Sequence, residues 1–126
     1  MDYMKEELQE AIRAITSMIN KSEKAQLKLK AGTWQHTMTV QALKADTIAI
    51  ALLNRELEAN PATGSFKSAY TEEELENALK TVTTIIGRVE KIQPKFEEHT
   101  PQHTLAVRRI KALDISLALI KREMNL

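Results

Sequence analysis

The chain has 126 residues, of which 18 are basic and 17 acidic, with three glycines, three prolines and no cysteine. This length suits one domain with its own core. A net charge of +1 removes the simplest electrostatic argument for a nucleic-acid or anionic-membrane partner, and we expect neither. Without cysteine, a disulfide framework and a thiolate site are excluded, and we expect a cytoplasmic protein. No apolar run is long enough to span a bilayer, and the acidic N-terminus is not typical of a signal peptide.

A tandem repeat organises the chain. Segment 33–37, Thr-Trp-Gln-His-Thr, returns at 100–104 as Thr-Pro-Gln-His-Thr. Sliding residues 3–59 onto 70–126 needs no gap and leaves 23 of the 57 aligned pairs identical. We therefore expect a single domain over residues 1–126, built from repeats at 3–59 and 70–126 and joined by a linker at 60–69.

Each copy is predicted to form an antiparallel pair of helices. Apolar residues recur at steps of three and four from Leu8 to Leu29, which predicts a first helix of about 27 residues. Gly32 tolerates a positive φ and is expected to end it. Thr33 fits the N-cap of the second helix, and proline at the equivalent first helical position, Pro101, supports this boundary. The short turn predicts a helical hairpin.

The second copy has its own boundary signals. Thr71 and Glu74 form the pattern of a capping box at the start of the third helix. Pro94 lacks a backbone donor and disfavours helical geometry at Gln93, so we expect a kink or an early end there. The predicted fold is therefore all-α, with four helices arranged as two hairpins in a helical bundle.

The second helix of each copy carries two separate apolar stripes. Such a helix must be covered on two sides. Either these are the inner helices of one chain, or one stripe meets another subunit, which predicts a homo-oligomer, most simply a dimer. In the first copy one stripe contains Leu43, Ile50, Leu53 and Leu57, and the other contains Met38, Ala45, Ile48 and Leu52.

The repeated Thr-x-Gln-His-Thr motif has two interpretations. It can cap a helix, with the threonine as N-cap. It can also mark an anion site, because a helix N-terminus attracts anions and a histidine and a lysine share one polar stripe of the helix. The candidate ligand-binding residues are Thr33, Trp34, Gln35, His36, Thr37 and Lys44, with Thr100, Gln102, His103, Thr104, Arg108 and Lys111 in the second copy.

Trp34 also has two interpretations. It can cover the end of the bundle as a hydrophobic plug, or it can serve as a stacking platform at the mouth of the anion site.

Other site chemistry finds little support in the sequence. Bundle metal sites use Glu-x-x-His repeats, which do not occur here, so we expect no metal or other cofactor. No Ser-His-Asp order or glycine-rich phosphate loop occurs either. We therefore expect a protein that is not an enzyme and has no catalytic residues.

The repeated motif and the segment 109–113 that follows its second copy resemble small all-helical proteins of Gram-positive bacteria and their phages. That resemblance implies a helical hairpin unit and brings no assigned reaction. In size and lack of catalytic groups, the chain also looks like phage-encoded proteins that sequester nucleotide immune signals. That likeness raises the hypothesis, which we adopt as the expected function, of non-enzymatic binding of a small phosphorylated ligand, such as a nucleotide signal. The alternative is a structural or protein-interaction module without a small-molecule ligand.

Overall fold

The computed structural model describes residues 3–58 and 70–124. They form four α-helices, and a 3₁₀ helix, η2 (Gln93–Lys95), follows the third of them. No strand occurs within these two ranges, so the expected all-α fold is confirmed. The linker expected at 60–69 lies outside the described residues. The α-helices are α1 (Lys5–Lys28), α2 (Trp34–Glu58), α3 (Glu72–Ile92) and α4 (Pro101–Glu123).

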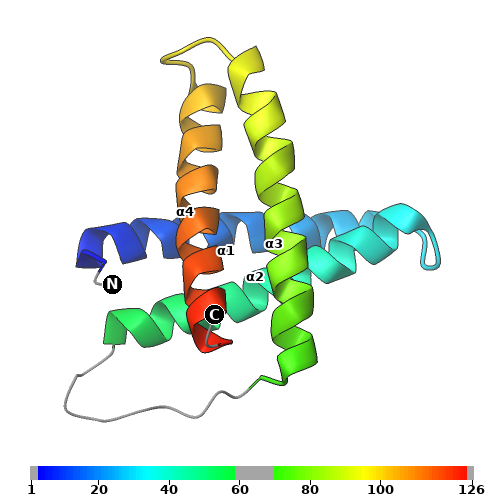
Figure 1. Ribbon diagram of the computed structural model, residues 1–126. Helices are drawn as coiled ribbons and strands as arrows, with labels where there is room; N and C mark the ends of the chain where they lie inside the picture. The colour runs from blue at the N-terminus through cyan, green and yellow to red at the C-terminus, as the bar shows by residue number, and fades with distance from the viewer. Residues whose placement is uncertain (1–2, 59–69, 125–126) are drawn as a thin grey trace.

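The two hairpins cross steeply rather than running side by side (Figure 1). Among the described residues, α2 and α4 each contact the other three helices, whereas α1 and α3 do not touch each other. α2 and α4 are therefore the inner helices, and their two apolar stripes face neighbours within the chain. These stripes no longer require a second copy. Homo-oligomerisation remains a prediction, which sedimentation at high protein concentration would test.

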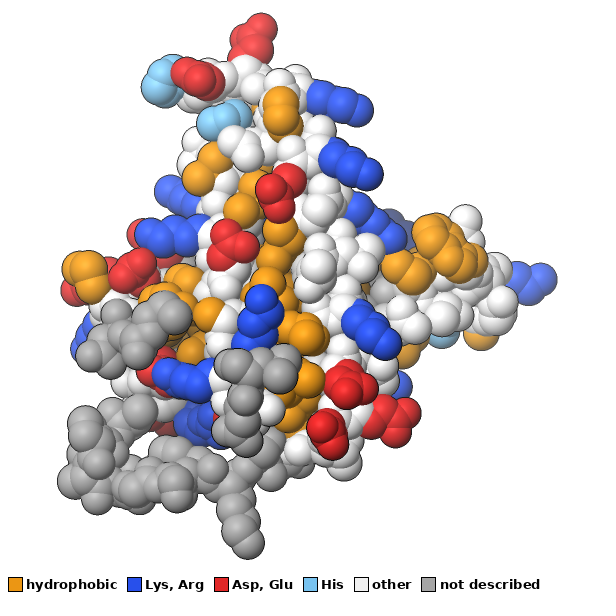
Figure 2. All heavy atoms as spheres, viewed as in Figure 1, with side chains coloured by type: hydrophobic (Ala, Val, Ile, Leu, Met, Phe, Trp, Pro, Cys, Tyr) orange, Lys and Arg blue, Asp and Glu red, His pale blue; other side chains and the backbone are white. Residues whose placement is uncertain are grey.

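The core takes side chains from all four helices. Ile15 of α1 and Leu53 of α2 are fully buried, and so are their equivalents in the second copy, Val82 and Ile120. Burying each such side chain stabilises the fold by roughly 1.5–3 kcal/mol. On the face shown in Figure 2, charged side chains are scattered over the surface, and a stripe of hydrophobic side chains runs down its middle.

The helix boundaries follow the signals in the sequence, with one exception. The Thr71 capping box is present, because Glu74 N donates to Thr71 Oγ1 at 3.1 Å and Thr71 N donates to Glu74 Oε1 at 2.9 Å. α3 ends early at Ile92 and tightens into η2 around Pro94, as expected. α1 is shorter than predicted, with 24 residues, because the backbone of Leu29 is already extended.

A turn with the same geometry connects the helices of each hairpin. Thr33 N donates to Lys30 O at 3.2 Å, and Thr100 N donates to Glu97 O at 3.3 Å. The third residue of each turn has a positive φ, 88° at Gly32 and 67° at His99, as type II turns require. Gly32 thus has the expected conformation, but it serves the turn and not the end of α1.

Two ion pairs join α2 to α4. Arg55 binds Glu123 through both guanidinium Nη atoms, with Nη1 3.0 Å from Oε2. Arg122 binds Glu56 in the same way. Arg55 is equivalent to Arg122, and Glu56 to Glu123, so the pairing is reciprocal, as contacts across a twofold axis are. Hydrogen bonding to Glu123 raises the pKa of Arg55.

Replacing Arg55 should cost more stability than replacing Arg122. The Glu123 side chain is only 9% exposed, whereas that of Glu56 is 18% exposed and Arg122 itself 48%. Arg55→Met removes both guanidinium hydrogen bonds from a largely shielded carboxylate and should lower the free energy of unfolding by about 2 kcal/mol, the scale of a hydrogen bond to a charged group. Arg122→Met, the matched control, should cost less than about 1 kcal/mol. Urea unfolding of both variants measures the difference, and equal losses would contradict this assignment.

Candidate functional site

The threonine of each repeated motif is a helix N-cap. Thr33 Oγ1 accepts a hydrogen bond from His36 N at 3.2 Å and donates to Lys30 O at 2.7 Å. Thr100 Oγ1 makes the equivalent bonds, at 3.2 Å from His103 N and 2.7 Å to a carbonyl oxygen in the preceding turn. Each threonine therefore satisfies one amide of the first helical turn and also fixes the preceding turn.

The other motif side chains lie at the ends of the hairpins. His36 and His103 are half-buried, and His103 Nε2 lies 3.4 Å from Gln93 Nε2, which links the start of α4 to η2. Trp34 is 67% exposed, so it does not cover the end of the bundle, and that interpretation is wrong. The remaining candidates Gln35, Thr37, Gln102, Thr104 and Arg108 are exposed.

The structure does not bring the two motifs together. The α1–α2 turn (cyan) and the α3–α4 turn (yellow to orange) project from the molecule in different directions (Figure 1). The polar stripes that follow the motifs are also partly used within the fold. Arg55 and Arg122 bind glutamates, and Lys111 Nζ lies 3.7 Å from Glu7 Oε2. Lys44 is exposed and forms no ion pair with any residue in the described part of the chain.

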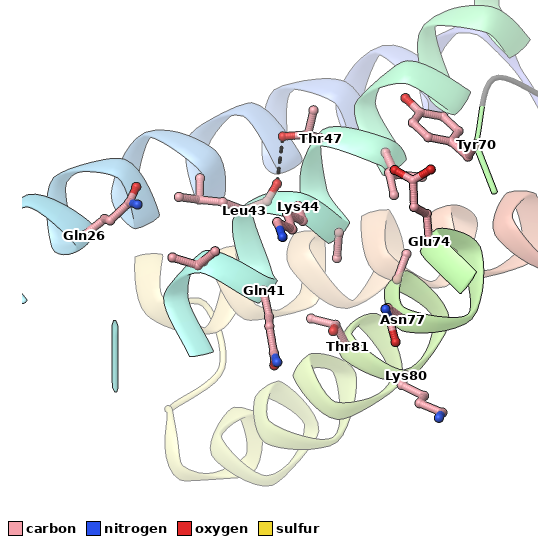
Figure 3. A pocket seen from close by; sticks show the side chains of 14 residues that line it. Gln26, Gln41, Leu43, Lys44, Thr47, Tyr70, Glu74, Asn77, Lys80 and Thr81 are labelled. Atoms are coloured by element: carbon pink, nitrogen blue, oxygen red, sulfur yellow. Dashed lines mark hydrogen bonds between the residues drawn. The ribbon is translucent and has the colours of Figure 1, made fainter. Parts of the chain in front are cut away.

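A groove of about 740 Å³ lies between α2 and α3, with Gln26 of α1 at its edge. Its apolar lining includes Leu43 and Ile48. Gln41 of α2 and Asn77 and Thr81 of α3 face this space from opposite helices (Figure 3). The other lining residues are Val40, Lys44, Ala45, Thr47, Tyr70, Glu74, Ala78 and Lys80.

Basic residues outnumber acidic ones around this groove. A smaller hollow of about 250 Å³ shares Gln41, Lys80 and Thr81 with it and adds Arg88. Three basic residues, Lys44, Lys80 and Arg88, thus line the two hollows together with one acidic residue, Glu74. Glu74 already accepts a hydrogen bond from the N-terminus of α3. The combined site can therefore attract an anion.

Among the described residues, the equivalent helix pair, α4 and α1, makes an ion pair that α2 and α3 do not make. Lys111 is the counterpart of Lys44, and Glu7 is the counterpart of Glu74. Lys111 and Glu7 form an ion pair. Their counterparts Lys44 and Glu74, which also belong to the described part of the chain, form no ion pair with each other. The two copies therefore give the same lysine different neighbours, and Lys44, which has no acidic partner among the described residues, lines the α2–α3 groove.

The sequence interpretation missed a buried acid on α2. Asp46 is 1% exposed, and its Oδ1 has no hydrogen-bond partner among the described residues. Desolvation raises the pKa of this carboxyl group to about 7. The repeat contained the signal, because the equivalent residue is Leu113, a fully buried core residue.

The described residues contain neither a candidate metal site nor a helix that could span a membrane. They contain no cluster of three or more histidine, cysteine or acidic side chains that could hold a metal ion. No helix in these ranges combines the length and apolar character needed to cross a bilayer.

Removing the caps should destabilise the fold without affecting the groove. Thr33→Ala and Thr100→Ala should each lower the free energy of unfolding by about 1 kcal/mol. His36→Gln and His103→Gln should leave the affinity for any groove ligand unchanged, because neither histidine lines the groove. Chemical denaturation and ligand titration of the four variants measure both effects. A loss of affinity in the histidine variants would instead indicate that the ligand binds at the repeated motifs.

Asp46 should make stability depend on pH. Its folded pKa, about 7, lies above its unfolded value near 3.9, so the folded state holds a proton that the unfolded state releases. Stability should therefore fall as pH rises from about 4 to 7, by up to about 4 kcal/mol, and stay low above that window. Asp46→Asn and Asp46→Leu should abolish this fall and be more stable than the wild type at pH 8. Denaturation curves of equal pH dependence in all three proteins would contradict this.

Comparisons with protein-family models, with curated proteins and with solved structures give no match. The functional interpretation consequently depends on the geometry of the α2–α3 groove and on the differences between the two copies.

Proposed function

We propose that the protein is a non-catalytic binding protein for a small anionic ligand of nucleotide size, bound in the groove between α2 and α3. One observation carries this proposal: Lys44, which forms no ion pair with another described residue, lines a groove whose other side chains are largely amide, hydroxyl and apolar. A nucleotide signal belongs to this class of ligand, and binding without turnover would sequester it.

The dimensions and chemistry of the groove support this class. Its volume of about 740 Å³ lies within the range of roughly 300–1,000 Å³ found for small-molecule sites. The apolar lining can pack against a ring, and the side-chain amides of Gln41 and Asn77 can both donate and accept hydrogen bonds, as the edge of a base does. Lys44 and Lys80 supply the charge that a phosphate requires.

This proposal moves the site away from the repeated motifs. Of the candidate ligand-binding residues predicted from the sequence, Lys44 lines the groove, and the others do not. The anion-site interpretation of the motifs is less favoured because the capping threonines already satisfy one amide each. The alternative, an interaction module without a small ligand, predicts that the groove binds none.

Lys44→Gln and its matched control Lys111→Gln test the proposal. Thermal shift against a panel of nucleotides, cyclic nucleotides and inorganic phosphate should identify a ligand, because a ligand at a hundred times its Kd adds about 2.7 kcal/mol. Lys44→Gln should then weaken that ligand by roughly tenfold to a hundredfold, as the loss of a charge-assisted hydrogen bond does. Lys111→Gln removes the same charge from the other copy and should leave affinity unchanged.

Two outcomes would contradict the proposal. No shift with any member of the panel would favour the interaction module. An equal loss of affinity in the two lysine variants would show that overall charge, and not the groove, attracts the ligand.

A further inference from the structure

The end of the α1–α2 hairpin exposes two large apolar side chains. Leu27, in the last turn of α1, is 88% exposed, and Trp34, the first residue of α2, is 67% exposed. We call residues 24–34 the first hairpin tip. It projects beyond α3 and carries hydrophobic side chains with a basic side chain beyond them (right side of Figure 2). Neither Leu27 nor Trp34 lines the groove.

The first hairpin tip is also basic. Lys24, Lys28 and Lys30 are exposed, and none forms an ion pair with another described residue. The sequence contains no acidic residue between Glu23 and Asp46. The nearly neutral chain thus concentrates positive charge beside Leu27 and Trp34, the two most exposed large apolar side chains among the described residues.

The turn between the two helices does not require exposed apolar and basic side chains. The second hairpin has a turn of the same geometry built from different residues. Prolines replace both apolar side chains, Pro94 at the position of Leu27 and Pro101 at that of Trp34. Glu97 stands where the first copy has Lys30, and another acidic residue follows it. The second hairpin tip, residues 91–101, is therefore an internal control with equal numbers of basic and acidic residues.

We propose that the first hairpin tip docks onto the surface of an anionic lipid bilayer. Trp34 would lie at the headgroup level, where tryptophan is enriched in membrane proteins, and Leu27 would enter the acyl boundary. The three lysines would contact anionic headgroups, each contributing about fivefold in affinity. A convex end with two apolar side chains needs no complementary pocket in a bilayer.

A lipid surface fits these residues better than a nucleic acid does. Trp34 could stack on a base, but Leu27 has no aromatic face, and it is the more exposed of the two. An aliphatic side chain gains affinity by entering hydrocarbon. The low net charge of the whole chain argued against a membrane partner, but the basic residues that matter here are local.

Trp34 provides a direct readout because it is the only tryptophan in the chain. The full-length protein is titrated with vesicles of phosphatidylcholine alone and of phosphatidylcholine containing about one-third phosphatidylserine. With the anionic vesicles, the emission of Trp34 should shift to shorter wavelength, and the protein should sediment with the lipid. Neutral vesicles should give little binding, and added salt should reverse the binding to anionic ones.

Two matched double variants separate this tip from general electrostatic attraction. Lys24→Gln with Lys28→Gln should weaken binding to anionic vesicles about 25-fold, at fivefold for each lysine. Lys91→Gln with Lys95→Gln removes the equivalent charges from the second hairpin and should leave binding unchanged. Leu27→Ser should weaken binding without lowering Tm, because Leu27 is almost fully exposed.

Several results would overturn the proposal. These are an unchanged Trp34 emission in the presence of either vesicle type, equal losses in the two double variants, and unchanged binding by Leu27→Ser. A shift with a single-stranded oligonucleotide but not with vesicles would assign the tip to nucleic acid instead. None of these results depends on whether the groove binds a ligand.

Discussion

The contact between α2 and α4 is the interaction on which the arrangement of this protein depends. It holds two crossed hairpins together through buried Leu53 and Ile120 and through the reciprocal pairs Arg55–Glu123 and Arg122–Glu56. These bidentate pairs are directional, so they determine where along the two helices the contact occurs. Apolar burial supplies most of the stability, whereas the guanidinium–carboxylate geometry limits the ways in which the hairpins can dock.

The local structure of the chain could be predicted from its sequence, and the packing of its hairpins could not. Thr71, Pro94 and Thr33 act on their own turns, so their effects on helix ends are visible in a short window of sequence. The steep crossing of the hairpins depends on side chains far apart in the chain, and no spacing rule revealed it. The groove and the Arg55–Glu123 pair follow from that crossing, and for this reason they were not expected.

The two copies are most informative where they differ. Some positions that remain alike serve the fold, such as the capping threonines and the arginines between α2 and α4. Three positions whose surroundings or identity differ carry features that the fold does not explain. Among the described residues, Lys44 lacks the acidic partner that Lys111 has. Asp46 stands where the second copy buries Leu113, and Trp34 stands where the second copy has a proline. A duplicated fold can keep one copy for stability while the other acquires a binding surface.

The reciprocity of the Arg55–Glu123 and Arg122–Glu56 pairs also bears on how chains recognise each other. Each hairpin offers its partner nearly the same surface that it receives, so the contact itself does not specify that both hairpins belong to one chain. The covalent connection makes that choice, because it keeps the two hairpins at a high effective concentration. A reciprocal contact of this kind permits exchange of hairpins between two copies, giving an intertwined dimer with the same interfaces as the monomer. Which of the two forms such an exchange would populate depends on the protein concentration relative to that effective concentration.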